Sequence, residues 1–227
     1  MYLRFFKRFF DIVLSLCALI LLSPVLLVLA ILVRVNLGSP VIFHQDRPGK
    51  DERIFRMCKF RSMTDARDEH GELLPDAERL TPFGRKLRAT SLDELPELWN
   101  ILKGDMSIVG PRPQLVRDMV FMTPEQRRRH TVRPGLTGWA QVNGRNILLW
   151  EDRLRYDLEY LERVSFLEDL KIMFLTVACL LHHDDVSTEG MATSEDLGDY
   201  LLRVGSVSAE DYAEKQNEAK KELAGVR

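Results

Sequence analysis

Cysteine is scarce in this sequence, and the spacings that would let it bind metal or build a disulfide framework are missing. The three cysteines, Cys17, Cys58 and Cys179, are widely separated, and there is no CxxC pair or zinc-finger spacing. Disulfide frameworks are typical of small secreted chains with an even number of cysteines. We therefore expect reduced thiols and a domain that faces the cytosol.

An excess of positive charge is missing as well. The chain carries 32 Lys and Arg against 34 Asp and Glu, a net charge of −2, and it has no RNP-like aromatic motif. Because dedicated nucleic-acid-binding domains usually show a basic excess, we expect no nucleic-acid partner. With 227 residues, 45% of them hydrophobic and 29% charged, the chain is long enough for one modest domain and accessory segments.

One long apolar run stands out from this ordinary composition. Residues 12–33 hold 22 consecutive positions without a charge. As a straight helix they would measure ~33 Å, about the thickness of a hydrocarbon core. A signal peptide fits poorly, because its apolar region usually spans about 7–15 residues and precedes a small-residue cleavage site. A fully buried core helix is a second alternative, and we interpret the run as a membrane segment.

Ser23 and Pro24 interrupt the middle of this run. A proline inside a helix removes one backbone hydrogen bond, here to the carbonyl of Ile20, at a cost of roughly 3 kcal/mol. The hydroxyl of Ser23 can bond to a freed carbonyl in the preceding turn, which makes a bend tolerable in lipid. The pair divides the run into residues 12–23 and 24–33, each about half as long as the membrane core is thick.

Basic residues flank the apolar run on both sides. Such residues mark the cytoplasmic side within about 15–20 positions of a membrane segment. A single crossing would place one basic flank outside, whereas a re-entrant helix–break–helix keeps both flanks inside. We favour the re-entrant form, and a kinked single span is the alternative that the sequence leaves open. The basic residues are Arg4, Lys7 and Arg8 before the run, and Arg34, Arg47, Lys50, Arg53, Arg56, Lys59 and Arg61 after it.

The rest of the sequence predicts an α/β domain that is mainly helical, with a short β-hairpin. Residues 41–44 and 54–60 show β-type runs around the turn "RPGKDE". Helical patterns follow in residues 81–104, after Thr123 as an N-cap, and in residues 150–181, whose apolar end is too short to span a membrane. We divide the chain into a membrane helix (residues 1–37), a cytosolic domain with membrane-surface helices (38–190) and a polar tail (191–227), which we expect to be frayed or helical.

The segment "SLDELPELWNILKG", residues 91–104, carries the strongest functional pattern. Ser91 and Glu94 have the spacing of a capping box, which places Asp93 and Glu94 in the first turn of a helix. Carboxylates there complement the helix dipole, which is a complete structural explanation. Pro96 indicates a function beyond capping, because a helix that only needs a cap has no use for a proline at its fifth position. An ionised Asp in such a turn is also a competent nucleophile toward an activated phosphoryl group, if a cation neutralises the charge between them.

Cations that could serve such a nucleophile occur in short, rigid sequence contexts. Arg112 is the sharpest candidate, because Gly110 and the prolines on both sides fix its backbone. The arginines at positions 127–129, in contrast, are expected on a solvated or membrane-facing surface. The other candidates are Lys59, Arg61, Arg85, Lys86, Arg88, Arg133 and Arg145.

Together these motifs resemble the bacterial sugar transferase family, and within it the small, PglC-like monotopic phosphoglycosyl transferases. The resemblance covers about residues 4–183. Its motifs, in order, are "KRFFDI" with the Ser23–Pro24 segment, "FHQDRPG", "KFRSM", "SLDELPELWNILKGDMSIVGPRP", "RPGLTGWAQVNGRN", and "YDLEYL" with "SFLEDLKI". The combination is very specific, whereas the polar tail has no counterpart.

The resemblance implies an activity and assigns roles to residues. The activity is transfer of a sugar-1-phosphate from a UDP-sugar to undecaprenyl phosphate, with release of UMP. It would take place at a re-entrant helix in the lipid bilayer, on the cytosolic face of the inner membrane. Asp93 corresponds to the nucleophile of a covalent phosphosugar intermediate and to a ligand of the required Mg²⁺, and Glu94 to its supporting carboxylate. The substrate site would be lined by Lys59, Arg61, Arg88, Arg112, Arg145 and Asp157.

Two questions stay open at the level of sequence. A membrane-anchored binding or assembly module, which keeps a nucleotide-sugar site without turnover, is the alternative from another functional class. The donor sugar is also open: N,N′-diacetylbacillosamine or another N-acetylated sugar such as GalNAc or GlcNAc is our first expectation, with galactose and glucose as alternatives. The sequence gives neither the pathway nor the oligomeric state.

Overall fold

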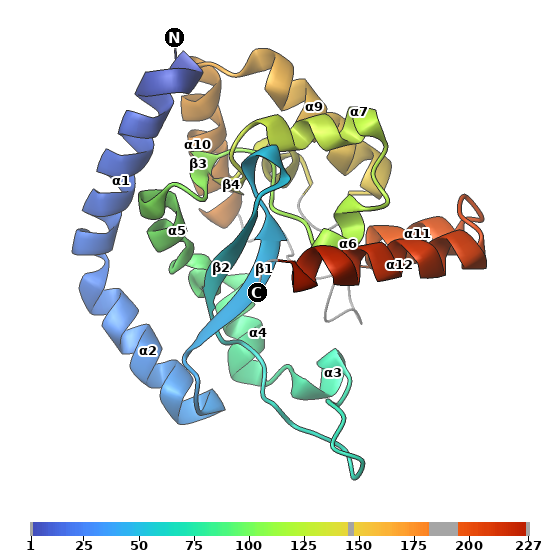
Figure 1. Ribbon diagram of the computed structural model, residues 1–227. Coiled ribbons are helices and arrows are strands. Elements are labelled where there is room, and N and C mark those ends of the chain that lie inside the picture. The colour runs from blue at the N-terminus through green and yellow to red at the C-terminus, as the bar shows by residue number, and fades with distance from the viewer. Residues whose placement is uncertain (1, 145–147, 182–194, 226–227) are drawn as a thin grey trace.

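The protein is mainly helical, with two small two-stranded sheets, as the computed structural model shows (Figure 1). The structure describes residues 2–144, 148–181 and 195–225. This architecture confirms the expected mainly helical fold with a β-hairpin. The helices are α1 (Lys7–Leu21), α2 (Ser23–Leu37), α3 (Asp76–Arg79), α4 (Pro82–Ala89), α5 (Glu97–Lys103), α6 (Val116–Met119), α7 (Pro124–Arg127), α8 (Trp139–Val142), α9 (Trp150–Arg163), α10 (Phe166–Leu181), α11 (Leu197–Arg203) and α12 (Ala209–Ala224). The strands are β1 (Ile42–Pro48), β2 (Ile54–Phe60), β3 (Ser107–Val109) and β4 (Gly135–Thr137).

The predicted break in the apolar run is present. Helices α1 and α2 meet at Leu22 with a bend of 64°. The hydroxyl of Ser23 donates to the carbonyl of Ile20 at 2.8 Å, and this is the carbonyl that Pro24 leaves without its usual amide partner. Both helices extend beyond the predicted segments, since α1 begins at Lys7 and α2 ends at Leu37.

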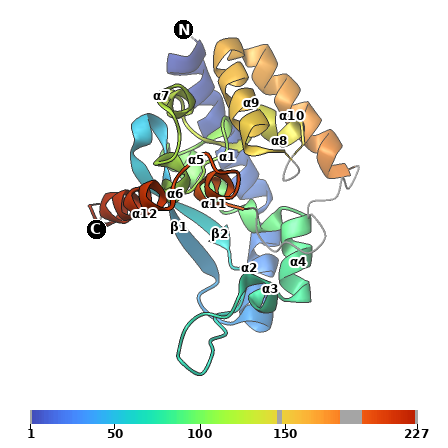
Figure 2. The same ribbon diagram turned by 90° about the vertical axis from the view of Figure 1, so that its right-hand side faces the viewer.

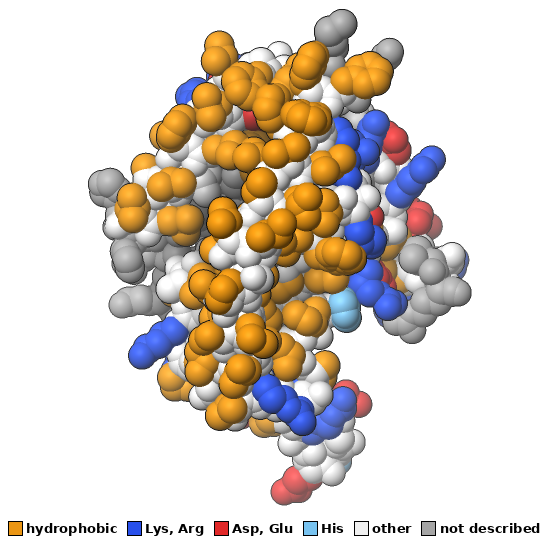
Figure 3. Space-filling model, turned by 90° about the vertical axis from the view of Figure 1, so that its left-hand side faces the viewer, with side chains coloured by type: hydrophobic (Ala, Val, Ile, Leu, Met, Phe, Trp, Pro, Cys, Tyr) orange, Lys and Arg blue, Asp and Glu red, His pale blue; other side chains and the backbone are white. Residues whose placement is uncertain are grey.

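Apolar side chains cover the outer face of α1 and α2 (Figure 3). They include Phe9 near the start of α1, Leu21 at the bend and Val35 near the end of α2, and the exposed Phe5 just before α1 continues this surface. Among the described residues, no single helix has both the length and the hydropathy needed to cross a bilayer, whereas the bent pair passes that test as a unit. The pair is therefore a candidate membrane segment.

The inner face of α1 is polar and fixes the helix to the rest of the protein. Lys7, Asp11 and Ser15 follow one another at intervals of four residues and are all buried. Lys7 pairs with Asp169 of α10, and the Asp11 carboxylate accepts hydrogen bonds from the hydroxyl of Ser107 at 3.0 Å and the amide of Ile108 at 2.9 Å. These contacts join α1 to β3 and α10.

The hairpin of β1 and β2 is antiparallel, in a register that pairs Ile42 with Phe60 and Pro48 with Ile54. The second strand has the predicted bounds, whereas the first continues four residues past the predicted end at His44. The smaller sheet joins β3 and β4 in parallel. At its edge a Cβ on Gly135 would lie 2.1 Å from the backbone nitrogen of Gly110, so only glycine permits this approach. The approach fixes the backbone just before Arg112.

Two apolar clusters hold the bent helix pair against the domain. Leu29, Val33 and Leu37 of α2 pack with Phe60 of β2 and Leu87 of α4. In the second cluster, Ala18, Leu19 and Leu22 pack on Met57, Leu98, Ile101 and Met106. The bent helix pair thus packs on both the β1–β2 hairpin and α5.

The described part of the polar tail is helical. Leu197 of α11 and Ala219 of α12 are buried in a cluster with Val116, Met119 and Phe121. Figures 1 and 2 show α11 and α12 on the side of the molecule opposite α1 and α2. The tail therefore covers the domain on the side away from the candidate membrane segment.

Candidate active site

The predicted capping box at Ser91 is wrong. Ser91 has a positive φ of 54°, and its side chain forms no capping hydrogen bond. Residues Leu92–Glu94 form a 3-10 turn, and α5 begins only at Glu97. The reason is Pro96, which has no N–H to donate to the carbonyl of Leu92. Instead, the amide of Leu95 reaches that carbonyl at 3.4 Å, and Asp93 and Glu94 lie on a tight turn in front of the helix.

Glu94 is the centre of a compact charge cluster. Its Oε1 atom accepts a hydrogen bond from Lys59 Nζ at 2.7 Å and another from Arg112 Nη2 at 2.7 Å. Lys59 comes from β2, and Arg112 from the rigid segment after β3. The structure thus brings together three predicted site residues that lie up to 53 positions apart in the chain (59 to 112).

The sequence interpretation missed a third carboxylate, Glu97. This residue is buried, and its Oε1 lies 3.1 Å from Lys59 Nζ. Glu94 and Glu97 are three positions apart, a spacing that places side chains on the same face of a helical segment. That spacing was the signal for Glu97 in the sequence.

Asp93 differs from Glu94, because its side chain has no polar partner among the residues that the structure describes. It is only 7% exposed, yet within the described ranges its carboxylate forms no hydrogen bond and no ion pair. Burial and the neighbouring charge of Glu94 raise the pKa of Asp93 to about 6, against the opposing charges of Lys59 and Arg88. At neutral pH the group is mostly ionised, so a carboxylate with uncommitted oxygens lies beside several cations.

The pKa values of the two glutamates move in opposite directions. Burial by itself would raise the pKa of Glu94, but Arg112 and Lys59 outweigh it and hold this pKa well below its usual range. Burial raises the pKa of Glu97 to about 7, because Lys59 compensates it only in part. Glu94 is therefore a permanent anion that orders two cations.

Arg88 joins the cluster from α4. Its Nε donates to the hydroxyl of Ser62 at 2.8 Å. Burial lowers the pKa of Arg88, and the charge of Asp93 acts against that effect, which is a sign of their proximity. Arg88 thus adds positive potential on the Asp93 side of the turn.

The buried ion pair between Arg129 and Asp157 holds the backbone of Arg112 in place. Arg129 donates from Nη2 to the backbone carbonyl of Arg112 at 2.6 Å, and its Nε and Nη2 reach Asp157 Oδ2 at 2.9 and 2.7 Å. The expectation that Arg129 lies on a solvated or membrane-facing surface is wrong, because the 3-10 turn Arg128–Thr131 directs this side chain toward α9. Its neighbour Arg128 is exposed, as expected.

Three further predicted site residues do not join the charge cluster in the described part of the chain. Asp157 is fully buried against Arg129, so it positions Arg129 and through it Arg112. Arg61 donates to the carbonyls of Ser39 and Met63 and thereby holds the segment after β2. Arg145 lies outside the described residues. Contact of these three residues with a substrate stays a prediction.

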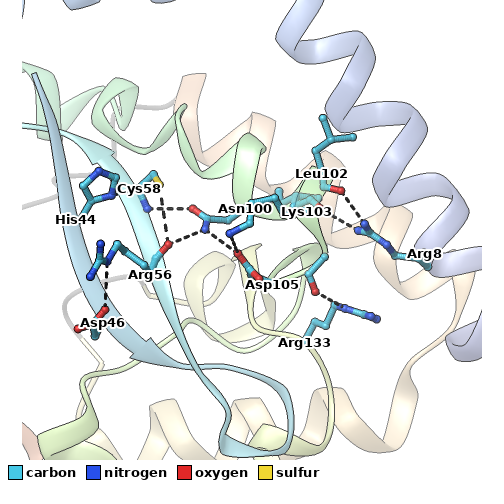
Figure 4. A network of polar contacts seen from close by, with 12 residues as sticks. Arg8, His44, Asp46, Arg56, Cys58, Asn100, Leu102, Lys103, Asp105 and Arg133 are labelled. Carbon is cyan, nitrogen blue, oxygen red and sulfur yellow. Dashed lines mark hydrogen bonds and ion pairs between the residues drawn. The ribbon is translucent and has the colours of Figure 1, made fainter. Parts of the chain in front are cut away.

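Asn100 connects the strand that carries Lys59 to α5, the helix that follows the turn Leu92–Glu94 (Figure 4). Its Oδ1 accepts from the amide of Cys58 at 2.9 Å. Its Nδ2 donates to the carbonyl of Arg56 at 2.8 Å and to Asp105 at 3.1 Å. Because Asn100 is completely buried, these bonds fix β2 against α5 and so set the distance from Lys59 to the glutamates.

The fit of a metal ion depends on Asp93. Within the described residues, no three His, Cys, Asp or Glu side chains form a ready-made metal site. Mg²⁺, however, is usually bound through one or two carboxylates plus substrate phosphates and water, rather than by an all-protein cage. The uncommitted carboxylate of Asp93 matches that mode of binding.

Comparison with known proteins assigns the family. The bacterial sugar transferase family model matches residues 2–183. The chain is 47% identical over 189 residues to the uncharacterized sugar transferase EpsL of Bacillus subtilis (strain 168), covering 83% of this chain and 94% of EpsL. It is 43% identical over 189 residues to the UDP-glucose:undecaprenyl-phosphate glucose-1-phosphate transferase of Escherichia coli (strain K12), covering 77% of this chain but 40% of that protein. Against the Klebsiella pneumoniae protein of the same name, it is 44% identical over 182 residues, 76% of this chain and 39% of that protein. The chain belongs to the bacterial sugar transferase family.

Proposed function

We propose that this protein transfers a sugar-1-phosphate from a UDP-sugar to undecaprenyl phosphate and releases UMP. The observation that carries the proposal is the uncommitted Asp93 carboxylate beside Glu94, which orders Lys59 and Arg112. Names of relatives support it, since proteins that match most of this chain are called glucose-1-phosphate and N-acetylgalactosamine-phosphate transferases acting on undecaprenyl phosphate. These relatives differ in the sugar, so the proposal covers the reaction and leaves the donor sugar to experiment.

The reaction has two displacements at one phosphorus atom. First, an Asp93 carboxylate oxygen attacks the phosphorus that bears the sugar, the bond to the bridging oxygen breaks, and UMP leaves with the electron pair. The product is an acyl phosphate that links Asp93 to the sugar phosphate. In the second displacement, a phosphate oxygen of undecaprenyl phosphate attacks the same phosphorus and Asp93 is released as a carboxylate.

Positive side chains stabilise the charge that develops on the diphosphate. Arg112 uses one guanidinium nitrogen for Glu94, and its side chain is 41% exposed, so its remaining N–H groups are available to phosphate oxygens. The same ion pair holds the guanidinium plane in place before the donor binds. Mg²⁺, bound by Asp93 and the donor phosphates, would supply further charge neutralisation at the diphosphate.

The bent helix pair is proposed to dip into the inner leaflet of the cytoplasmic membrane and return. Its outer face is apolar, and the bend lies midway along it. Basic residues flank the pair at both ends, which matches a topology with both ends in the cytosol. In this monotopic arrangement the catalytic turn would meet the lipid phosphate at the level of the headgroups.

The proposed activity is tested by UMP release. Solubilised protein with Mg²⁺ is incubated with a panel of UDP-sugars, with and without polyprenyl phosphate as the lipid acceptor. We expect rapid UMP release for a restricted set of donors, and a lipid-linked product only with the acceptor. Absence of UMP for every donor would favour the alternative, a module that binds nucleotide sugars without turnover.

Replacing Arg112 with Ala is expected to raise the KM for the UDP-sugar by about tenfold or more, because a charge-assisted contact with the diphosphate is lost. Steady-state kinetics measure the effect, and thermal unfolding checks the fold. Arg128→Ala is the matched control, since Arg128 is an exposed arginine outside the cluster. An unchanged KM in Arg112→Ala would limit Arg112 to a structural role.

Replacing Pro24 with Ala is expected to straighten the helix pair and shift part of the population to a membrane-crossing topology. Alanine restores the amide that can bond to the carbonyl of Ile20, so the break loses its cause. The measurement is labelling of a cysteine placed at Tyr2 by a membrane-impermeant reagent in intact cells. External labelling of the protein that retains Pro24 would refute the re-entrant topology.

A further inference from the structure

A cavity lies on the inner side of α1, and none of its lining residues belongs to the Glu94 cluster. It has a volume of about 330 Å³, and its walls come from the start of α1, the hairpin turn after β1, β3, and the segment just before β4. Four of the residues that line it are basic and one is acidic. The proposed transfer reaction uses none of them.

Internal contacts neutralise only part of this charge. Lys7 is paired with Asp169, and Asp11 is held by hydrogen bonds from Ser107 and Ile108. The positive charges of Arg8, Arg133 and Lys50 remain on the cavity wall. The cavity is thus lined by cations in excess of its one carboxylate.

Arg8 and Arg133 approach the carboxyl end of α5 from two sides (Figure 4). Arg8 donates to the carbonyls of Ile101 and Leu102, and Arg133 Nε donates to the carbonyl of Gly104 at 2.8 Å. Across the ranges that the structure describes, neither guanidinium is in an ion pair with a carboxylate, and the two terminal nitrogens of Arg133 have no hydrogen-bond partner. Two fixed guanidinium groups without a direct carboxylate partner among the described residues favour an anion, and planar guanidinium groups suit phosphate oxygens in particular.

The cavity opens at the border of the apolar face. Leu3 is one of its lining residues and is 45% exposed, and the neighbouring Phe5 and Phe6 are exposed on the same turn. In Figure 3, Lys and Arg side chains gather along one edge of the apolar surface. A ligand with a phosphate on an apolar body would satisfy both parts of this site, whereas free phosphate would use only the cations.

We propose that this cavity binds the phosphate group of an anionic phospholipid, held between Arg8, Arg133 and Lys50 with its apolar part along Leu3. This proposal depends on the membrane placement of α1 and α2 that is part of the proposed function. It does not depend on the transfer reaction, so absence of UMP release would not contradict it. The bound lipid would fix the depth of α1 through the phosphate level of the bilayer.

Lipid retention by the full-length chain tests this site. The protein is reconstituted into nanodiscs of phosphatidylglycerol and phosphatidylcholine in equal amounts, extracted gently, and examined by native mass spectrometry. We expect selective retention of a single phosphatidylglycerol. Arg133→Gln should weaken retention about tenfold, as expected for losing charge-assisted hydrogen bonds. Arg56→Gln is the matched control, because Arg56 is an exposed arginine outside the cavity lining.

The outcomes separate the possible ligands. Equal retention of both lipids, or equal loss in Arg56→Gln and Arg133→Gln, would overturn the proposal. Displacement of phosphatidylglycerol by excess inorganic phosphate would assign the site to free phosphate and overturn the lipid assignment. If Arg133→Gln lowers the thermal stability, lipid retention is measured in Lys50→Gln instead. Lys50 is exposed at the cavity and its nearest charge partner, Asp51, is 4.0 Å away, so this substitution should leave the fold intact. Unchanged retention in Lys50→Gln would then contradict the site.

Discussion

Replacing Asp93 with Asn is expected to reduce turnover by about 10⁴-fold or more and to abolish any covalent phosphosugar adduct. Asparagine has nearly the same shape but no ionised oxygen, so the proposed attack on phosphorus loses its nucleophile. The fold should survive, because Asp93 makes no hydrogen bond or ion pair within the described part of the chain. UMP release measures turnover, and the intact mass of the protein after incubation with donor alone measures the adduct.

The control for this substitution is Asp51→Asn. Asp51 is an exposed aspartate in the hairpin turn with a φ of 54°, a conformation that asparagine also adopts readily. It should keep full turnover. If Asp93→Asn still formed an adduct with the same mass shift, the nucleophile would be another side chain. Lost turnover together with a disordered fold would show that the substitution acts through folding. Circular dichroism separates these two cases.

Replacing Asp157 with Asn is expected to lower the free energy of unfolding by about 3–5 kcal/mol, since it leaves the buried Arg129 charge without its counter-ion. The KM for the donor should rise as well, because Arg129 holds the backbone carbonyl of Arg112. Denaturant titration of the solubilised protein measures the first effect, and steady-state kinetics the second.

Asp152→Asn provides a matched control on the same helix. Asp152 also pairs with an arginine, Arg155, at 2.8 Å, but both side chains are exposed. An exposed pair contributes about 0–1 kcal/mol, so this variant should be close to the parent protein. Equal destabilisation by the two substitutions would show that burial of the Arg129–Asp157 pair has no special energetic role.

Local sequence signals predicted much of the fold correctly. Pro24 and Ser23 act within one helical turn, and the bend and the Ser23–Ile20 hydrogen bond follow from the chemistry of those residues. The β-type run at Ile54–Phe60 likewise forms its strand with the predicted bounds. The capping box failed at a place where two local signals conflict. Pro96 has no N–H to donate to the carbonyl of Leu92, so Leu92–Glu94 form a 3-10 turn and the α-helix begins only at Glu97.

The other failed prediction, for Arg129, and the residue that was missed, Glu97, both involve partners distant in sequence. Arg129 looked like part of a charged surface, since only the folded chain brings Asp157 beside it, 28 positions away. Glu97 was overlooked because its significance depends on Lys59 of another strand. The cluster around Glu94 was predictable as a set of residue types. Its arrangement, with Glu94 at the centre and Asp93 without a side-chain partner in the described part of the chain, required the tertiary structure.

The buried polar face of α1 gives this helix a structural role that a generic apolar helix would not fill. Lys7 and Asp11 are joined to α10 and β3, and β3 leads directly into the loop that carries Arg112. In the proposed monotopic arrangement, a chimera that carried a generic apolar hairpin in place of residues 7–37 would stay attached to lipid. It would lose the fixed spacing between the bilayer surface and the turn Leu92–Glu94, which carries the proposed nucleophile. Its reaction with water-soluble acceptor analogues would then survive better than its reaction with long-chain lipid acceptors.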